Sequence, residues 1–347
     1  MKKLLEFIFV AILAISYSCC SNQQSVKEPV VLAYVTSWSS IMPDPTYLTH
    51  INYSFGHVNE TFNGVIINRP PREGSNENDG RPTSEDRLRS IVELKKQKPS
   101  LKIMLSIGGW GSGRFSEMAA DEKNRLAFAA DCRRVVKEFG LDGIDMDWEY
   151  PTSSMARISS SPEDTDNFTL LMRDIRNAIG KNKLLTFASS ANAKYVDFKA
   201  IDKYVDFINI MTYDMGVPPY HHSALFPSEH SELSCQESVD LHIAAGIAPN
   251  KLTLGMPFYG KGGIRLRFWE IPNQTEYTDN WDDVAKVPYL TDSEGKFVLT
   301  YENARSIAIK CEWLKERGLL GAMYWEYSSD DSEGTLRKTV FNGVMGK

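Results

Sequence analysis

Three carboxylates occupy every second position of one short and largely apolar segment. They are Asp145, Asp147 and Glu149, within residues 141–149. Because successive side chains of a β-strand point to opposite faces, the three acids share one face at intervals of about 6.6 Å. Carboxylates that leave water and lie close together repel one another, so at least one is expected to be neutral near pH 7, with a raised pKa. A neutral carboxylic acid beside an ionised one is suited to general acid–base catalysis.

Two other interpretations of this segment stay open at this point. The acids could face bulk water from a surface strand, or their oxygens could bind Mg²⁺ or Ca²⁺. The residues between the acids favour a central strand over a surface strand, because Ile144, Met146 and Trp148 give its second face an apolar surface to bury.

The elements that would position these acids alternate between short apolar runs and amphipathic stretches. Strands are predicted at residues 30–36, 50–55, 101–107, 141–148, 184–188, 205–212, 251–258 and 321–325, and helices at 85–98, 121–139, 162–180, 235–245 and 301–317. Ser234 and Glu237 have the spacing of a capping box before the fourth helix, and Thr300 is expected to cap the fifth at Tyr301.

Eight strands alternating with helices predict an α/β fold with a parallel sheet closed into a (β/α)8 TIM barrel. An open doubly wound sheet is the rival, but no Gly-x-Gly-x-x-Gly turn follows the first strand. A small α+β insertion, about residues 261–299, is expected between strands 7 and 8, because this aromatic, turn-rich interval is too long for one connection. The acids would then line the barrel interior near its C-terminal mouth, where active sites of this fold lie.

Several motifs resemble those of the family-18 glycoside hydrolases, the chitinases and related enzymes. Residues 142–149 read DGIDMDWE, similar to the family's DGxDxDxE signature. Further similarities are SIGG at 106–109 on strand 3, MTYD at 211–214 on strand 6, GMPFYG at 255–260 on strand 7 and YWE at 324–326 on strand 8. The resemblance extends from about residue 30 to residue 341.

The resemblance implies substrate-assisted catalysis, in which the substrate's own N-acetyl carbonyl attacks the anomeric carbon. Glu149 would be the general acid and later the base. Asp147 would hold the acetamido nitrogen and exchange a proton with Asp145, and Tyr213 would donate to the acetamido oxygen. No cofactor and no metal are expected.

The same resemblance assigns a set of substrate-binding residues. Trp325 would form the floor under the reacting sugar, and Tyr34 and Ser106 would hydrogen-bond the innermost Asp. The remaining members of the predicted set are Asp214, Met211, Trp110 and Phe55. Trp38 is open between sugar stacking and an ordinary core position, and Trp313 is expected to be structural. Lys261 stands where related chitinases often carry Arg.

The implied function is a retaining glycosidase of the chitinase type, which cleaves β-1,4 bonds of N-acetylglucosamine glycans such as chitin oligosaccharides through an oxazolinium intermediate. One alternative is an endo-β-N-acetylglucosaminidase that acts on glycoprotein N-glycans. Another is a lectin-like chitin-binding protein without turnover. The resemblance also predicts non-proline cis peptide bonds at Ser54–Phe55, Glu149–Tyr150 and Trp325–Glu326.

The N-terminus has the composition of an export signal. Lys2 and Lys3 precede an apolar run at residues 7–15, which is too short to span a bilayer. It resembles a bacterial lipoprotein signal, residues 1–19, with lipid attachment at Cys19 or alternatively Cys20. A linker at 20–29 and the barrel at 30–347 would follow. The protein is expected to be exported and anchored in the cell envelope by its lipid, or alternatively secreted.

The composition excludes several other classes of function. The chain has 347 residues with 39 Lys+Arg against 45 Asp+Glu, a net charge of −6, which gives no reason to expect a nucleic-acid partner. The three later cysteines have neither disulfide nor metal-site spacing and are predicted to be buried free thiols: Cys132, Cys235 and Cys311. Three histidines are predicted to be loop residues outside any metal site: His221, His222 and His230. The oligomeric state is not indicated.

Overall fold

The computed structural model describes residues 28–67, 83–263 and 265–346. The predicted signal peptide, Cys19, Cys20 and the linker up to residue 27 lie outside these ranges. Of the helices that are described, none has both the length and the hydropathy that crossing a bilayer requires.

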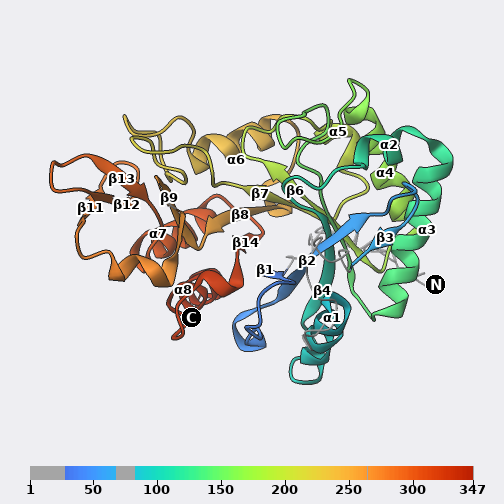
Figure 1. Cartoon of the computed structure of the whole chain (residues 1–347), viewed down its shortest axis with the longest axis horizontal. Coiled ribbons are helices and arrows are strands. Elements are labelled where there is room, and N and C mark those ends of the chain that lie inside the picture. The colour runs from blue at the N-terminus through green and yellow to red at the C-terminus, as the bar shows by residue number, and fades with distance from the viewer. Residues whose placement is uncertain (1–27, 68–82, 264, 347) are drawn as a thin grey trace, which may run out of the picture.

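Eight parallel strands close into a barrel (Figure 1). Its strands are β1 (Val30–Thr36), β2 (His50–Val58), β4 (Lys102–Gly108), β5 (Gly143–Asp147), β6 (Leu184–Ser190), β7 (Phe207–Met211), β8 (Leu252–Pro257) and β14 (Gly321–Trp325). β1 pairs in parallel with both β2 and β14, which closes the ring. A short strand, β3 (Val65–Ile66), adds to β2 in antiparallel orientation. The predicted (β/α)8 barrel is confirmed.

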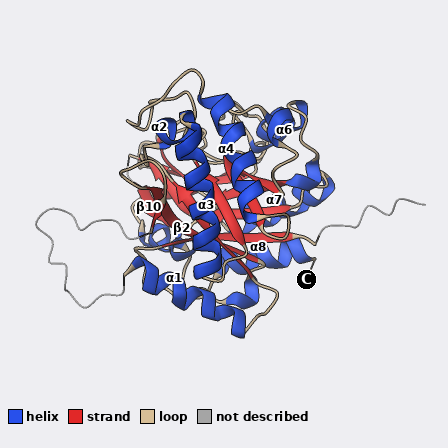
Figure 2. Ribbon diagram, turned by 90° about the vertical axis from the view of Figure 1, so that its right-hand side faces the viewer, coloured by secondary structure: helices blue, strands red, loops and turns tan. Residues whose placement is uncertain are grey.

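Helices cover the outside of the barrel. They are α1 (Ser84–Val92), α2 (Phe115–Ala120), α3 (Glu122–Glu138), α4 (Asp164–Ile179), α5 (Phe198–Ile201), α6 (Cys235–Ala244), α7 (Ala304–Glu316) and α8 (Thr335–Met345), with 3-10 helices η1 (Pro45–Tyr47), η2 (Glu93–Lys96), η3 (Pro249–Lys251), η4 (Phe268–Asn273) and η5 (Tyr327–Ser329). Figure 2 shows α3 and α4 side by side over the strands.

Two helix starts test the capping predictions. The capping box of Ser234 and Glu237 is present at the start of α6, as predicted. The expected cap at Thr300 is wrong, because α7 begins at Ala304 and Asn303 caps it. Thr300 instead ends a strand, where it pairs with Tyr289. The Asn303 side chain accepts from the backbone N–H of Ser306 in the first turn of α7. Thr300 lies three residues farther from the helix and cannot reach this N–H.

The strands separate two apolar layers. Outward side chains such as Ile144, Met146 and Trp148 pack with the helices in the larger cluster, and Trp148 stacks on Phe115 of α2 at 5.3 Å between ring centroids. A smaller cluster inside the barrel includes Leu32, Met104 and Met323. The alternation within β5 therefore places its acids inside the barrel.

A second, antiparallel sheet lies between β8 and α7 and forms the insertion (Figure 1, left). Its strands are β9 (Tyr259–Gly262), β10 (Arg265–Arg267), β11 (Thr278–Asp282), β12 (Val287–Thr291) and β13 (Phe297–Thr300), in the order β10-β9-β13-β12-β11. The 3-10 helix η4 is its helical part among the described residues. The insertion stands beside the barrel mouth, because β9 begins two residues after β8 ends.

Candidate active site

Asp145 accepts four side-chain hydrogen bonds inside the barrel. Its Oδ2 accepts from the hydroxyls of Tyr34 (2.9 Å) and Ser106 (2.8 Å). Its Oδ1 accepts from the hydroxyl of Thr186 (2.5 Å) and the amide of Asn209 (3.1 Å). Burial raises the pKa of Asp145, and the four donors oppose that rise by favouring the ionised form.

Asp147 and Glu149 continue from Asp145 toward the C-terminal end of β5. Burial raises the pKa of Asp147 well above its usual range, and the carboxyls of Glu149 and Asp145 add to the rise. Its Oδ1 is buried and accepts no hydrogen bond from the described residues. Burial likewise raises the pKa of Glu149 to about 7, against an opposing hydrogen bond with Tyr150. Near neutral pH, Glu149 can therefore give up a proton, while the Asp147 Oδ1 beside it is available to accept a hydrogen bond.

Two glycines allow the end of β4 to approach β5 beside Asp147. Gly108 and Gly109 have φ angles of +132° and +89°, which side chains with a Cβ rarely adopt. A Cβ on Gly108 would lie 1.9 Å from the Asp147 carbonyl oxygen, and one on Gly109 would lie 2.7 Å from the Phe55 ring. Gly109 N–H donates to the same carbonyl at 2.8 Å. The backbone at Asp147 is thus fixed by its neighbour strand.

Asp214, just after β7, is a strongly stabilised carboxylate. Its Oδ1 accepts from the Tyr259 hydroxyl at 2.8 Å and lies 3.0 Å from Lys261 Nζ and 3.7 Å from His222 Nδ1. Although burial alone would raise it, the pKa of Asp214 is held well below its usual range, with His222 the largest cause and Lys261 next. The resulting negative charge helps to raise the pKa of Glu149.

Aromatic rings surround the carboxylates. Trp325 at the end of β14 stacks on Phe55 with ring centroids 5.6 Å apart, and lies 5.8 Å from Tyr34. Trp38 lies 6.4 Å from Trp325 and is 64% exposed, so the core interpretation of Trp38 is wrong. Trp110 is 59% exposed. Exposed indole faces of this kind suit the C–H faces of sugars.

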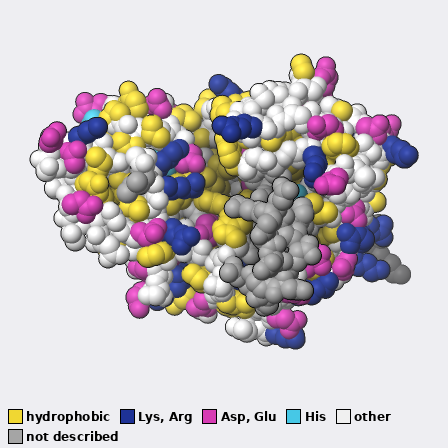
Figure 3. Space-filling view, in the orientation of Figure 1, with side chains coloured by type: hydrophobic (Ala, Val, Ile, Leu, Met, Phe, Trp, Pro, Cys, Tyr) yellow, Lys and Arg dark blue, Asp and Glu magenta, His cyan; other side chains and the backbone are white. Residues whose placement is uncertain are grey.

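These groups open into one cleft of about 920 Å³. Its lining comes from the barrel mouth and the insertion: Tyr34, Trp38, Phe55, Trp110, Asp147, Glu149, Tyr150, Tyr195, Met211, Tyr213, Asp214, Tyr259, Lys261, Arg265 and Trp325 among others. On the face drawn in Figure 3, hydrophobic side chains gather between the insertion at the left and the barrel at the right, with Lys and Arg side chains beside them. The cleft thus has an apolar wall and a charged rim.

The structure brings most of the predicted site residues together in this cleft, although their roles stay predictions. Asp145 and Ser106 are exceptions, because both are fully buried below the cleft lining, where Ser106 donates to Asp145. The predicted lipid-attachment residue, Cys19, lies outside the described residues. Sequence reasoning missed Thr186 and Asn209, whose positions on β6 and β7 carry no local signal. It also missed Tyr150 and Tyr195, which stack at 5.0 Å on the cleft wall.

Other predicted features can be placed as well. The three non-proline cis bonds occur where the resemblance puts them. The three later cysteines are buried free thiols, and Trp313 is buried in the core. His221 and His222 are loop residues but are fully buried, in contact with Asp282 and Asp214 respectively. Within the described ranges, no group of three or more His, Cys, Asp or Glu side chains is placed to hold a metal ion.

Comparison with known sequences gives a consistent result. The sequence profile described as "Glycosyl hydrolases family 18" matches residues 30–330. Chitinase A1 of Niallia circulans is 31% identical over 400 aligned residues, which cover 89% of this chain and 57% of that protein. Probable chitinase 2 of Drosophila melanogaster is 29% identical over 92% of this chain and 76% of its own length. The chain thus spans little more than half of Chitinase A1.

Solved structures agree with the sequence matches. A glycoside hydrolase family 18 N-acetylglucosaminidase from Paenibacillus barengoltzii superposes with a TM-score of 0.79 at 32% identity, covering 91% of this chain and 100% of that one. Chitinase ChiW from Paenibacillus sp. str. FPU-7 superposes with a TM-score of 0.82 at 30% identity, covering 92% of this chain and 43% of that one.

Proposed function

Because the chain belongs to glycosyl hydrolase family 18, we propose that it hydrolyses β-1,4 bonds next to N-acetylglucosamine, with chitin oligosaccharides as its substrates. The names of the similar chitinases support this substrate class. The observation that carries the proposal is the ladder formed by the buried Asp145 and Asp147 and the half-buried Glu149, which opens into an aromatic-lined cleft.

In the first step, Glu149 gives its proton to the glycosidic oxygen as the bond from that oxygen to the anomeric carbon breaks. The carbonyl oxygen of the substrate's acetamido group forms a new bond to the same carbon, which yields an oxazolinium ion. The raised pKa of Glu149, about 7, keeps the acid form available at neutral pH. The leaving sugar departs with the proton of Glu149.

Asp147 would accept a hydrogen bond from the acetamido N–H. Its buried Oδ1 has no partner among the described residues, and a substrate N–H would satisfy that acceptor. As positive charge develops on the oxazolinium ring, Asp147 would pass its proton to Asp145, the next acid below it in the ladder, and become ionised. Tyr213 would donate to the acetamido oxygen and hold it in line with the anomeric carbon.

In the second step, the Glu149 carboxylate takes a proton from water, whose oxygen attacks the anomeric carbon and reopens the ring. Two successive attacks from opposite faces leave the product with the configuration of the substrate. Trp325, Phe55 and Trp38 would support the sugar rings by stacking.

Product analysis on a glycan panel tests the proposal. Chitobiose to chitohexaose and a high-mannose glycopeptide would be digested with wild type and with Glu149→Gln. Release of N-acetylglucosamine oligomers by the wild type alone is expected. Cleavage of the glycopeptide only would establish an endo-β-N-acetylglucosaminidase instead, and binding without product from any glycan would establish a lectin-like protein.

We also propose that the protein is exported and anchored in the cell envelope through a lipid on Cys19. The support is the N-terminal sequence, with Lys2 and Lys3, an apolar run and then the Cys19–Cys20 pair before a polar stretch. An exported location would give the enzyme access to glycans outside the cytoplasm.

A further inference from the structure

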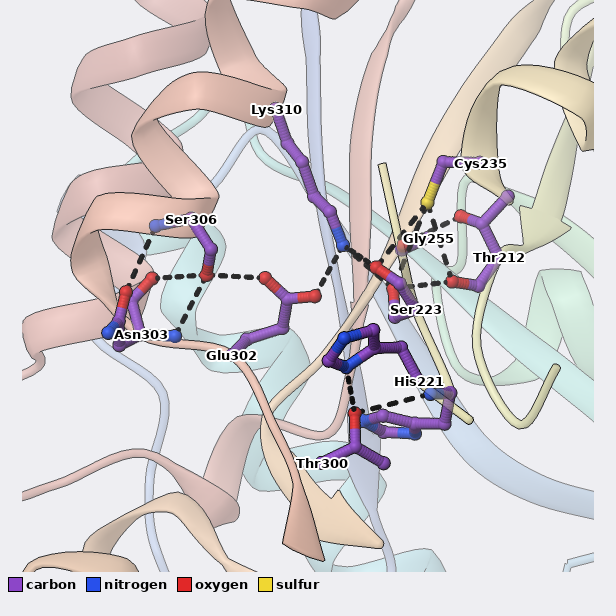
Figure 4. A network of polar contacts seen from close by, with 11 residues as sticks. Thr212, His221, Ser223, Cys235, Gly255, Thr300, Glu302, Asn303, Ser306 and Lys310 are labelled. Atoms are coloured by element: carbon purple, nitrogen blue, oxygen red, sulfur yellow. Dashed lines mark hydrogen bonds and ion pairs between the residues drawn. The ribbon is translucent and has the colours of Figure 1, made fainter. Parts of the chain in front are cut away.

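A charged pair is buried between α7 and Ser223 (Figure 4). Lys310 of α7 and Glu302, which precedes α7, form an ion pair, and both side chains are 0% exposed. Taking two charges out of water is costly and is tolerated only where further hydrogen bonds satisfy both groups. The hydrogen-bond partners of Lys310 and Glu302 therefore identify the backbone segments that this ion pair connects.

All the donors of Lys310 are used. Its Nζ contacts Glu302 Oε1, the Ser223 carbonyl oxygen at 2.5 Å and the Ser223 hydroxyl at 2.8 Å. An ammonium group has three N–H bonds, so these three acceptors complete it. On the other side of the pair, Glu302 Oε2 accepts from the Ser306 hydroxyl at 2.6 Å. The pair thus links α7 firmly to Ser223.

The hydroxyl of Ser223 has a fixed direction. Because its oxygen accepts from Lys310, its hydrogen is free to point to the Thr212 carbonyl oxygen, 2.7 Å away. That carbonyl belongs to the peptide bond that leads into Tyr213. The Thr212 side chain adds a second tie, since its hydroxyl donates to the Gly255 carbonyl in β8 at 2.7 Å.

The loop between Thr212 and Ser223 is closed by one more bond, from Met215 N–H to the His222 carbonyl at 3.1 Å. Tyr213 and Asp214 lie between these two cross-links. Asp214 has a φ angle of +58°, an uncommon value for a residue with a Cβ, and the cross-links hold the backbone around it. The backbone that carries the two site side chains is thus held by residues that do not line the cleft.

We propose that Ser223, held by the buried Lys310–Glu302 pair, is a positioning residue that orients Tyr213 for the reaction. The inference rests on the proposed function, because it assigns Tyr213 the task of aligning the acetamido group. Ser223 and Lys310 touch no substrate in this scheme. They act through the peptide plane that carries Tyr213.

Two matched serine variants separate positioning from ordinary stabilisation. Ser223→Ala and Ser306→Ala each remove one buried hydroxyl from the same network, but only Ser223 is on the side of Tyr213. Both variants are expected to lower the Tm. Ser223→Ala is expected to lower kcat on chitotetraose about tenfold with KM little changed, because a misaligned group loses rate more than affinity. Ser306→Ala is expected to keep the wild-type kcat.

A double-mutant cycle with Tyr213→Phe completes the test. If Ser223 acts through Tyr213, then Ser223→Ala causes no further loss of kcat in the Tyr213→Phe background. Independent, multiplying losses would overturn the inference, as would equal kcat losses in the two serine variants or none in Ser223→Ala. A wild type that releases no product from chitotetraose overturns the proposed function and this inference together, whereas an active wild type with any of those outcomes overturns the inference alone.

Discussion

The protonation of Glu149 gives the sharpest test of the chemistry. With a pKa of about 7, this carboxyl is half protonated at neutral pH, whereas a carboxyl at the ordinary value of 4.5 would be protonated to only about 0.3%. Burial thus makes the acid form about 150-fold more abundant at pH 7. We therefore expect kcat/KM to fall on the alkaline side with a midpoint near pH 7, as the acid is lost.

The assay is kcat/KM on chitotetraose from pH 4 to pH 10, for wild type and for Glu149→Gln. Removing a general acid is expected to lower kcat by about 10²–10⁴-fold and to abolish the alkaline midpoint. The control substrate is a chitobioside with an acidic phenol as leaving group, because this leaving group needs less protonation. Glu149→Gln should therefore slow the first step less on this substrate than on chitotetraose. An alkaline midpoint that persists in Glu149→Gln would refute the assignment of the acid.

Three further predictions concern Asp147 and Trp38 in the structure and Cys19 in the N-terminal sequence. Asp147→Asn is expected to raise the Tm measured by differential scanning calorimetry at pH 8 but not at pH 4. The Asp147 carboxyl ionises near pH 3.8 in the unfolded wild type but only at higher pH in the folded one, so rising pH favours unfolding of the wild type. An equal gain in Tm at both pH values would contradict this. Trp38→Ala is expected to raise KM for chitohexaose roughly 2–10-fold by loss of stacking. The control is Trp269→Ala, at an exposed Trp of the insertion outside the cleft lining, and it is expected to leave KM unchanged. Equal changes of KM in the two variants would count against sugar binding by Trp38. Cys19→Ser is expected to abolish palmitate labelling in the bacterial expression host and to release the protein to the soluble fraction, and labelling that survives would transfer the attachment to Cys20 or exclude it.

The barrel could be predicted because its signals are local. Alternation of apolar and acidic residues fixes which side of β5 faces inward, and the predicted bounds of β1 and β14 match the structure. The ladder of Asp145, Asp147 and Glu149 follows from the same period of two. The cap at Thr300 failed for a local reason as well, because a strand of the insertion extends to that residue and Asn303 is the better cap.

The rest of the site depends on contacts between distant segments. The donors to Asp145 come from four other strands, and only barrel closure and strand register bring Thr186 and Asn209 to its Oδ1. Likewise, nothing near Lys310 in the sequence indicates that it reaches Ser223, 87 residues away. Trp38 could not be placed because an apolar residue after a strand is equally compatible with core and cleft.

The most direct test of the central claim is the configuration of the first product. Chitotetraose would be cleaved inside an NMR tube, and the anomeric proton of the newly formed reducing end recorded before mutarotation. The ladder of carboxylates acting with the substrate's own acetamido group predicts the β-anomer, with retention. Initial appearance of the α-anomer would contradict it.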